Sequence, residues 1–565
     1  MTARALLPYG WRDYRWRWLP RDAMAGITTA AVVLPQTLAY AALAGVPAYV
    51  GLYTACVPAL VYAFVGTSRA LSVSSTATVA MLTGAALTGV APFANADELV
   101  RASATLSLLT GLMLVIAAVL RFGFLANFIS APVLTGFRAG VAIVVLIEQL
   151  PRLFGLHIRS GRRLQEVADM AMSLPDTSWA TLALGATSVF GILAMQRRWP
   201  RLPSTLIAVM FGTTLSFAFD LGAHGVEVVG RVPVGLPSLV RPNTALIGEL
   251  WPAAMGIALM SFIQSLAAAQ SVVRAGEPYP NADVELRALG MAGVGGSLFG
   301  CLPASGATMP STVNDGAGAR SQLSGLFVAL LALVAMEWLA PLLERIPNAT
   351  LAAIAIVFTA HLISPREFAA IRAVRRTEFT WALVAMLGVV AFGALRGIVV
   401  AIVVSLMSLA YQTLRPRLHV LRRKPGTRRF RPQTPRTSDD EDVPGLLVLR
   451  PEGRLFFGNA AYFGERIQPL IAESKPRVIL LDLRAVFDIE YTALMALTDA
   501  EAKQRAAGTD LWLAGMTPDV LETLRRAPLY ATLGEGRIFA SVADAIAAWD
   551  ALPHDREAEV VLEDD

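Results

Sequence analysis

The sequence has little charge and almost no cysteine. Only 16% of its 565 residues are charged and 55% are hydrophobic, whereas about 25% of the residues of an average soluble protein are charged. The two cysteines, Cys56 and Cys301, both lie in apolar surroundings. Two such cysteines are too few for a disulfide framework, and their separation in the sequence does not match the spacing of metal ligands. With a mean hydropathy of +0.54, the composition predicts a membrane protein.

Sequence motifs of catalysis are also missing. The five histidines are scattered, and no catalytic triad, HExxH sequence or Walker loop is found. We therefore expect neither enzymatic activity nor a bound metal or cofactor. The first twenty residues are rich in Arg and Trp and lack the continuous apolar core of a signal peptide.

Apolar segments are what the chain has instead, and we count about fourteen of them. They lie near residues 23–44, 49–65, 75–92, 102–121, 131–150, 178–196, 203–220, 251–273, 286–300, 308–318, 322–342, 348–363, 378–394 and 396–413. Several are shorter than the roughly 20 residues of a full membrane span, as expected where helices are broken. Seven segments in each half predict two inverted repeats, at about 22–222 and 251–414.

Positive charge flanks the apolar part. Five arginines precede the first segment, and the stretch 415–436 carries nine Arg or Lys residues without an acidic one. Nucleic-acid binding is one interpretation of such a run, but juxtamembrane charge on the cytoplasmic side is the better one. We therefore expect both termini to be cytoplasmic, in a multi-pass protein of the cell membrane. The arginines of the loop at 151–176 conflict with this topology.

Composition changes abruptly after Leu414 and defines the remaining domains. Residues 1–21 read as a cytoplasmic N-terminal segment, 22–414 as the membrane domain, 415–441 as a basic linker, 442–552 as a soluble α/β domain and 553–565 as an acidic tail. In the soluble part, strands are predicted at 446–449, 478–483 and 511–514, and helices at 493–507, 518–525 and 542–549. Alternating strands and helices imply a layered sheet.

Two stretches of small residues, 66–78 and 300–314, interrupt the apolar segments at matching places in the two halves. Gly and Pro break a helix, and inside a membrane a break is tolerated only where protein or a water-filled cavity satisfies the backbone. A helix that restarts there points free N–H groups and the positive end of its dipole at the break. The pair predicts an anion site near the bilayer midplane.

The chain resembles the SulP family, the sulfate permease type of anion transporter. The matching stretches in the membrane part are 35–41, 66–78, 128–137, 285–290 and 300–320. The soluble part resembles the STAS domain that ends many of these proteins, with matches at 453–459 and 478–497. The resemblance implies a core domain, a gate domain, an elevator or rocking movement, and a homodimer.

The resemblance also places the anion between the N-termini of spans three and ten, beside span one. When the family's site positions are transferred to this sequence, the implied substrate site comprises Gln36, Tyr40, Ser74, Ser75, Thr76, Gln264, Gly306, Ala307, Thr308 and Met309. A structural role is the alternative to ligand binding at these positions. Gln36 and Tyr40 would then only pack between helices, and the hydroxyl residues would only cap them. We expect a branched side chain at Gly306 to fill the backbone approach to the ligand without affecting folding.

The chain departs from the family pattern at three positions. Many members carry Arg where this chain has Pro310, and ion-coupled members usually have a carboxylate where it has Gln264. Without the Arg, the site has only dipoles and hydroxyls, which makes a doubly charged anion harder to hold. Gln264 cannot balance Na⁺ with charge, and a Thr that helps the sodium site in the bicarbonate-transporting branch falls on Ala268, so Na⁺ coupling is not expected. Glu148 is the remaining candidate for proton coupling, with pairing to Arg152 as the structural alternative. In the STAS-like part, Thr492 is a candidate phosphorylation site, or simply a helix N-cap.

These observations favour a secondary transporter of small anions such as sulfate, bicarbonate, chloride or a dicarboxylate. Two alternatives stay open: a nucleobase-type permease of the same fold, and a sensor or scaffold that acts through its STAS-like domain without transport. The expected partners are the anion, the lipid bilayer, a second copy of the chain and a cytosolic protein that binds the STAS-like domain. No nucleic-acid partner is expected.

Overall fold

The structure is a computed structural model. It describes residues 14–90, 95–124, 130–156, 169–199, 202–222, 225–230, 232–233, 235–427, 429–433 and 439–552. The predicted acidic tail and most of the N-terminal segment lie outside these residues. The chain forms two compact units, Met1–Leu406 and Met407–Asp565. The boundary falls inside the last long helix rather than at its end, where the composition changes.

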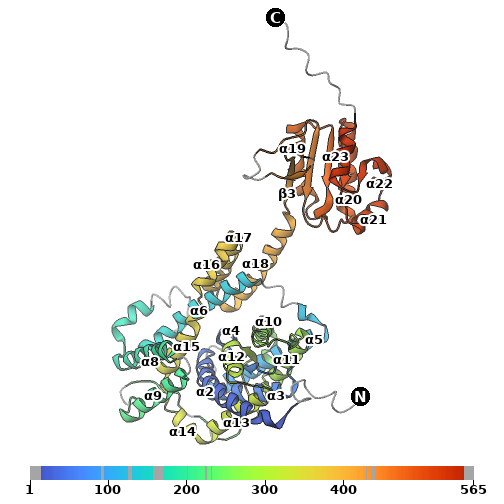
Figure 1. Ribbon diagram of the computed structural model, residues 1–565. Coiled ribbons are helices and arrows are strands. Elements are labelled where there is room, and N and C mark those ends of the chain that lie inside the picture. Colours follow the sequence, from blue (N-terminus) through green and yellow to red (C-terminus); the bar gives the residue numbers. More distant parts are fainter. Residues whose placement is uncertain are drawn as a thin grey trace, which may run out of the picture. The chain divides into compact units, whose positions relative to one another are not determined.

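The first unit is helical, and each of the fourteen predicted segments contains a helix (Figure 1). The helices are α2 (Leu19–Leu43), α3 (Tyr49–Val65), α4 (Ala77–Val90), α5 (Ala96–Val119), α6 (Ala131–Phe154), α8 (Trp179–Arg198), α9 (Ser204–Ala218), α10 (Ile247–Ser271), α11 (Ala282–Ser297), α12 (Thr308–Gly316), α13 (Leu323–Trp338), α15 (Asn348–Ala360), α17 (Arg376–Phe392) and α18 (Ala394–Leu414). Two further helices, α14 (Ala340–Leu343) and α16 (Pro365–Val374), were not predicted. Short 3₁₀ turns lie at Trp16–Trp18, Leu174–Asp176 and Thr244–Leu246.

Six helices of the described chain are long and apolar enough to cross a membrane. Five shorter apolar helices, among them α3, α4 and α13, accompany them. Short spans are expected where a helix is interrupted near the bilayer midplane. The first unit is therefore built as a polytopic helical membrane protein.

Local sequence explains several helix ends. Asn95 and Glu98 form a capping box at the start of α5, and Asn281 accepts hydrogen bonds from two backbone N–H groups at the start of α11. Gly155 ends α6 and Gly300 follows α11, both in the left-handed conformation that glycine adopts without strain.

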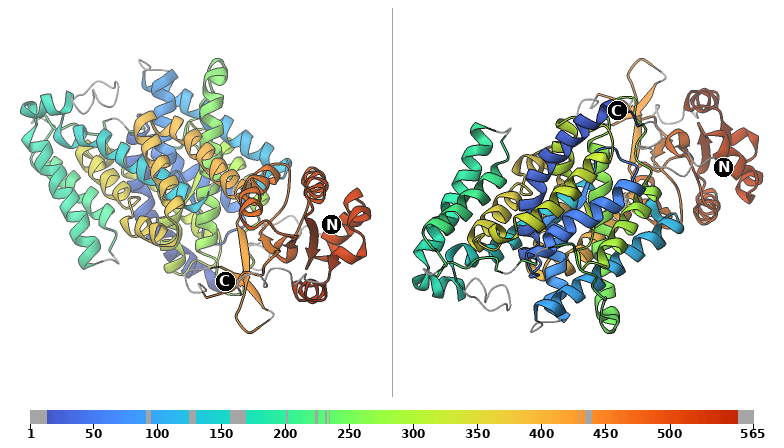
Figure 2. Two further views of the ribbon diagram at one scale, coloured as in Figure 1. Left: turned by 90° about the horizontal axis from the view of Figure 1, so that it is seen from above. Right: turned by 90° about the horizontal axis from the view of Figure 1, so that it is seen from below.

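Close packing joins the helices of the first unit in two groups. In one group α11 packs on α5 and α3, α13 on α2 and α3, and α10 on α5 and α4. In the other, α17 and α15 pack on α6, and α8 packs on α15 and α9. The blue-green helices α8 and α9 lie at one edge of this unit in both views of Figure 2. The grouping is consistent with the expected core and gate.

The second unit is an α/β domain around a sheet. In the described residues the sheet has six strands in the order β4-β3-β5-β6-β7-β8. The strands are β3 (Leu418–Arg423), β4 (Phe430–Pro432), β5 (Leu446–Pro451), β6 (Val478–Asp482), β7 (Asp510–Ala514) and β8 (Ile538–Phe539). The helices are α19 (Ala460–Ser474), α20 (Tyr491–Ala506), α21 (Pro518–Arg525), α22 (Pro528–Leu533) and α23 (Val542–Asp550), with 3₁₀ turns at Leu483–Ala485 and Glu535–Arg537.

Strands β5 to β8 pair in parallel, whereas β3 is antiparallel to both β4 and β5. One face of the sheet is covered by α19 to α22, and the other by α23 with its buried Trp549. The predicted strands and helices of this domain are present. Helices α19 and α22 and strands β3, β4 and β8 were not predicted from the sequence.

The predicted basic linker is more than a linker. Strands β3 and β4 lie within it and extend the sheet, with Leu421 of β3 buried. The positive charge of its basic run is also partly neutralised by acidic residues at 440 and 442. Arg422 pairs with Asp442 at 2.8 Å, and Arg431 pairs with Asp440 at 2.7 Å. Part of a run that is basic in sequence therefore forms the edge of the folded domain and is paired with acidic side chains there.

Candidate functional site

The two predicted breaks come together as a short antiparallel ribbon. Strand β1 (Ser72–Ser74) pairs with β2 (Ser305–Ala307), with Val73 opposite Gly306. Helix α4 follows β1 and helix α12 follows β2, so the two helices start from opposite ends of the same ribbon. Both N-termini, with their free N–H groups and partial positive charge, are thus brought to one place.

The first turn of α12 is open on one side. Thr308 and Met309 are exposed, while Ala307 before them and Pro310 after them are buried. Ala307 is the N-cap residue and its side chain provides no cap. Pro310 has no N–H group, so the donors of this turn come from its neighbours. An anion at this opening would meet uncapped backbone donors rather than a charged side chain.

Helix α10 forms the support under both helix starts. Gln264 accepts a hydrogen bond from the Thr76 hydroxyl at 2.8 Å, next to the first residue of α4. One residue on, the Ser265 hydroxyl accepts a hydrogen bond from the Gly306 N–H at 2.6 Å. Ser261, one turn earlier, donates to the Ala304 carbonyl at 2.5 Å. Three polar contacts within about one turn of α10 therefore position β1–α4 and β2–α12 on one helix.

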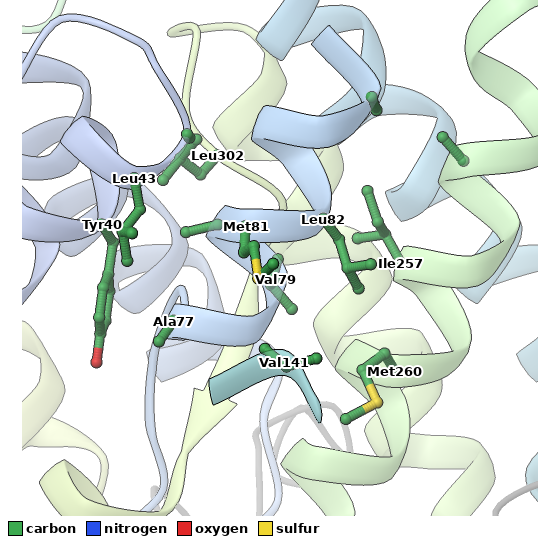
Figure 3. Close-up of a cluster of buried hydrophobic side chains, with 14 of the residues drawn as sticks. Tyr40, Leu43, Ala77, Val79, Met81, Leu82, Val141, Ile257, Met260 and Leu302 are labelled. Carbon is green, nitrogen blue, oxygen red and sulfur yellow. The ribbon is translucent and has the colours of Figure 1, made fainter. Parts of the chain in front are cut away.

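Helix α2 supplies the other wall. The Gln36 side chain contacts the Met309 sulfur at 4.0 Å, so α2 touches the first turn of α12. Tyr40 lies one turn further along α2 and is 7% exposed. Tyr40 and Ala77 of α4 belong to the same buried cluster, and in Figure 3 the Tyr40 hydroxyl points away from Leu43 and Leu302. Both predicted residues of the first span therefore lie next to the two helix starts.

Two serine hydroxyls in the ribbon region have no hydrogen-bond partner among the residues that the structure describes. The Oγ atoms of Ser75 and Ser305 are buried and make no hydrogen bond within the described chain. Ser74, the neighbour of Ser75, donates only to the adjacent carbonyl at 3.3 Å. Buried hydroxyls normally find a partner, so free ones beside two helix N-termini are suited to a ligand. Ser305 was not predicted, although it lies directly opposite Ser74 in the ribbon.

One expectation at Gly306 is wrong. A Cβ atom there would lie 2.9 Å from Leu71 Cδ1 and 3.0 Å from Ser265 Cα. The missing side chain is therefore replaced by protein, not by ligand. A branched residue would disturb the contact between β2 and α10 and could not leave folding intact.

Glu148 and Thr492 lie elsewhere. Glu148 is exposed near the end of α6, and Arg152, one turn on, donates to the Ala42 carbonyl at the end of α2. Thr492 is exposed at the second position of α20, whose N-cap residue is Glu490. The alternative in which Thr492 is the N-cap is therefore wrong. An accessible hydroxyl in the first turn of a helix remains compatible with a modification site.

Buried charges behind the ribbon were missed by the sequence argument. Glu285 of α11 is fully buried and accepts hydrogen bonds from the hydroxyls of Tyr62 and Thr67. Arg69 pairs with Glu277 at 2.8 Å and with Asp315, which is in α12, at 2.5 Å. These contacts hold the segment that leads into β1. The available signal was a charged residue inside or beside an apolar segment, which is costly unless it is paired.

Asp22 plays a similar part at the other end of α12. Its carboxylate is fully buried and accepts hydrogen bonds from the backbone N–H groups of Arg320 and Ser321. It therefore ties the loop between α12 and α13 to the start of α2. The sequence argument had placed this residue only as the first of the membrane domain.

Comparison with known proteins agrees with this architecture. The profile of the sulfate permease family matches residues 19–385, and that of the STAS domain matches residues 437–545. The chain belongs to the sulfate permease family. The family consists of transporters, so the expectation that the chain is not an enzyme is confirmed by its membership.

Relatives of this permease match over nearly its whole length. A probable sulfate transporter of Mycobacterium tuberculosis is 33% identical over 550 residues, covering 95% of this chain and 96% of that protein. High affinity sulfate transporter 2 of Stylosanthes hamata is 28% identical, covering 96% of this chain and 86% of that protein.

Solved structures share the fold. The murine Solute Carrier 26 family member A9 anion transporter in the inward-facing state superposes with a TM-score of 0.86 at 22% identity, covering 97% of this chain and 94% of that chain. The transmembrane domain of the cyanobacterial bicarbonate transporter BicA superposes with a TM-score of 0.59 at 25% identity, covering 69% of this chain and 98% of that chain. The polytopic helical fold with a C-terminal STAS domain is thereby confirmed.

Proposed function

We propose that this permease is a secondary transporter that carries a small anion across the cell membrane. The anion is bound between the N-termini of α4 and α12. The observation that carries the proposal is the β1–β2 ribbon, which brings two helix starts together without a cationic side chain at the opening. Family membership favours anion transport over a nucleobase cargo, because the matched family is that of sulfate permeases.

The binding role of each residue follows from its place. Backbone N–H groups of Thr308 and Met309 and the hydroxyls of Ser75 and Ser305 provide donors. Gln264 and Thr76 hold the start of α4, while Gln36 and Tyr40 of α2 border the opening opposite α12. Dipoles and hydroxyls alone hold a singly charged anion more readily than a doubly charged one.

Transport requires this site to open to each side of the membrane in turn. Because the site residues lie on α2, α4, α10 and α12, which pack together, we propose that this group moves as one body against α6, α8, α15 and α17. Such an elevator movement would carry the anion without rebuilding the ribbon. We further propose a homodimer, which the family resemblance implies, with both termini in the cytoplasm, as the flanking positive charge predicts.

The test is uptake into proteoliposomes that contain the purified protein. Labelled sulfate, bicarbonate, chloride and fumarate are offered singly, each with and without a Na⁺ or H⁺ gradient. We expect saturable uptake of at least one anion and no dependence on Na⁺, since Gln264 offers no charge. If correctly folded protein takes up none of these anions, the result would favour the alternative in which the protein is a sensor or scaffold.

A further inference from the structure

Arg138 is a cationic residue inside a membrane-spanning helix. It is the eighth residue of α6, which has 24 residues and is long and apolar enough to cross a membrane. A helix of this length rises about 36 Å, and its first seven residues rise about 10 Å, so Arg138 lies several ångströms inside a hydrocarbon core of about 30 Å. A charge at this depth is costly in lipid. Such residues face the protein interior or water and mark the paths of substrates and ions.

The side chain of Arg138 is partly exposed and is not held in a salt bridge. Its guanidinium donates no hydrogen bond and forms no ion pair with any residue that the structure describes. Glu367 of the neighbouring helix α16 acts on its charge from further away. The Glu367 carboxylate is exposed and accepts a hydrogen bond of 3.2 Å from the Thr135 hydroxyl, one turn before Arg138. The positive charge of Arg138 is therefore available to an anion.

The position of Arg138 on α6 directs it toward the helices that bear the proposed anion site. Val145 and Arg152 follow at intervals of seven residues, which brings the three side chains onto one stripe of the helix. Val145 is fully buried in the cluster that also contains Tyr40 of α2. At the far end of the stripe, Arg152 donates a hydrogen bond of 2.8 Å to the Ala42 carbonyl of α2. The stripe therefore lies along the seam between α6 and the group that contains α2.

In the proposed topology, Arg138 lies on the cytoplasmic side of the anion site. Helices α2 and α6 are the first and fifth spans, so both run outward from the cytoplasm. The stretch of α6 from Arg138 to Arg152 rises about 21 Å, whereas that of α2 from Gln36 to Ala42 rises about 9 Å. Because Arg152 and Ala42 are in contact, Arg138 is about 12 Å further toward the cytoplasm than Gln36.

We propose that Arg138 attracts the transported anion at the cytoplasmic entrance of the seam and raises its concentration at the site. This role rests on the proposed transport function. The site itself offers backbone and hydroxyl donors, so the charge that favours anions stands on the opposite wall of the seam. At about 12 Å and an intermediate dielectric constant, one unit charge favours a singly charged anion by about tenfold. At that distance Arg138 acts by long-range attraction and does not touch the bound anion.

The test compares Arg138→Gln with the wild type in inverted membrane vesicles, which present the cytoplasmic face to the labelled anion. The probe is whichever of sulfate, bicarbonate, chloride and fumarate the wild type carries fastest. We expect the KM of the variant to be about tenfold higher. Its maximal rate should change much less, because a charge at an entrance acts mainly on association. An unchanged KM would overturn the proposal, and so would a loss of maximal rate alone.

Two further variants separate charge from packing. Arg138→Lys keeps the positive charge and should hold KM within about twofold of the wild type, as should the control Arg197→Gln. The control removes the same charge from the exposed end of α8, on the same side of the membrane in the proposed topology. An equally large rise in KM in Arg197→Gln would attribute the effect to net charge. A failure of Arg138→Lys to restore KM would attribute it to packing. Either result would contradict the proposal.

Ionic strength tests the same charge in the wild type, without reliance on the folding of a variant. The Debye length falls from about 30 Å at 0.01 M salt to about 10 Å at 0.1 M. We expect potassium gluconate to raise the KM of the wild type over this range and to change that of Arg138→Gln much less. An equal dependence in both proteins, or none in the wild type, would contradict the attraction.

Failure of this role is distinguishable from failure of the proposed function. If the wild type carries none of the four anions, the transport function fails and the role of Arg138 fails with it. If the wild type transports and the KM of Arg138→Gln is unchanged, only the role of Arg138 is refuted.

Discussion

The hydroxyl of Thr76, immediately before α4, donates a hydrogen bond of 2.8 Å to the side-chain oxygen of Gln264 in α10. The same hydroxyl oxygen accepts a hydrogen bond from the Val79 N–H at 3.3 Å, in the first turn of α4. Thr76 thus caps the helix and joins it to α10 at once. Because the Gln264 oxygen is occupied by Thr76, its amide nitrogen is the end that can serve an anion.

Gln264→Glu should impair transport. The change keeps the shape of the side chain and the acceptor for Thr76, but it replaces an N–H donor with a negative charge. Repulsion between two like charges about 4 Å apart costs several kcal/mol even at an intermediate dielectric constant, so we expect uptake of the transported anion to fall at least about tenfold. Initial uptake rates in proteoliposomes measure the effect.

Gln270→Glu is the matched control, because Gln270 is exposed six residues further along α10. It should leave the uptake rate within about twofold, as a surface substitution usually does. Equal rates in Gln264→Glu and the wild type would place the anion away from Gln264.

Gly306→Ala should reduce both transport and stability. The added methyl group would lie 2.9 Å from the end of the Leu71 side chain and 3.0 Å from Ser265 Cα, so Leu71 must shift and β2 must move slightly away from α10. Overpacking of this kind costs about 1–3 kcal/mol. We expect a lower thermal unfolding midpoint in detergent, together with a loss of uptake.

Gly316→Ala, at the last residue of α12, which follows β2, provides the comparison. Nothing lies within 4 Å of the position that its Cβ would take. Alanine also suits a helix better than glycine. Its unfolding midpoint and uptake should therefore match or exceed those of the wild type. A Gly306→Ala protein that behaves like Gly316→Ala would mean that β2 is not held closely against α10.

The sequence could predict the helical segments and the two breaks, because hydrophobic runs and small residues report directly on burial and helix interruption. It could not predict that Ser305 lies opposite Ser74, since strand register depends on how two distant segments meet. The supporting contacts of Glu285 and Asp22 were missed for the same reason. A charged residue shows its partner only when the fold brings the two together.

The soluble domain illustrates a different limit of prediction from sequence. Buried strands such as β6 are continuous apolar runs and are readily recognised. Strand β3 is short, and its sequence, LHVLRR, ends in two arginines within a basic stretch, so it looks like part of a linker. Its place in the sheet depends on pairing with β5 and β4, and on ion pairs with Glu441 and Asp442, which lie between those two strands.

Glu285 should be essential for holding the β1–β2 ribbon in place, although it is not one of the residues of the proposed anion site. Glu285→Ala leaves the buried hydroxyls of Tyr62 and Thr67 without their acceptor. Hydrogen bonds to a charged group are worth about 1.5–3 kcal/mol each, so we expect a marked fall in the unfolding midpoint and in uptake.

Tyr62→Phe removes only one of these donors and should have a smaller effect of the same kind. Glu249→Ala, at an exposed carboxylate in the first turn of α10, is the control and should change neither quantity appreciably. If Glu285→Ala and Glu249→Ala were equally mild, the buried carboxylate would have no part in holding the segment before β1.

The STAS domain should lose stability in acid through Asp440. Arg431 donates two hydrogen bonds of 2.7 Å to this carboxylate, which lowers its pKa below the usual value of an aspartate. Because the folded-state pKa is the lower one, the contribution is fully present above about pH 4, where an unfolded aspartate is ionised. It is lost as the pH falls from there through the lowered pKa.

The measurement is the difference in unfolding midpoint between the wild type and Asp440→Asn from pH 7 down to pH 3. We expect a constant difference in favour of the wild type above about pH 5, and a shrinking one below about pH 4. Asp499→Asn, at an exposed position of α20, should show no comparable difference at any pH. A difference that grows in acid would contradict the sign of the shift, and with it the view that this pair fastens the basic segment to the sheet.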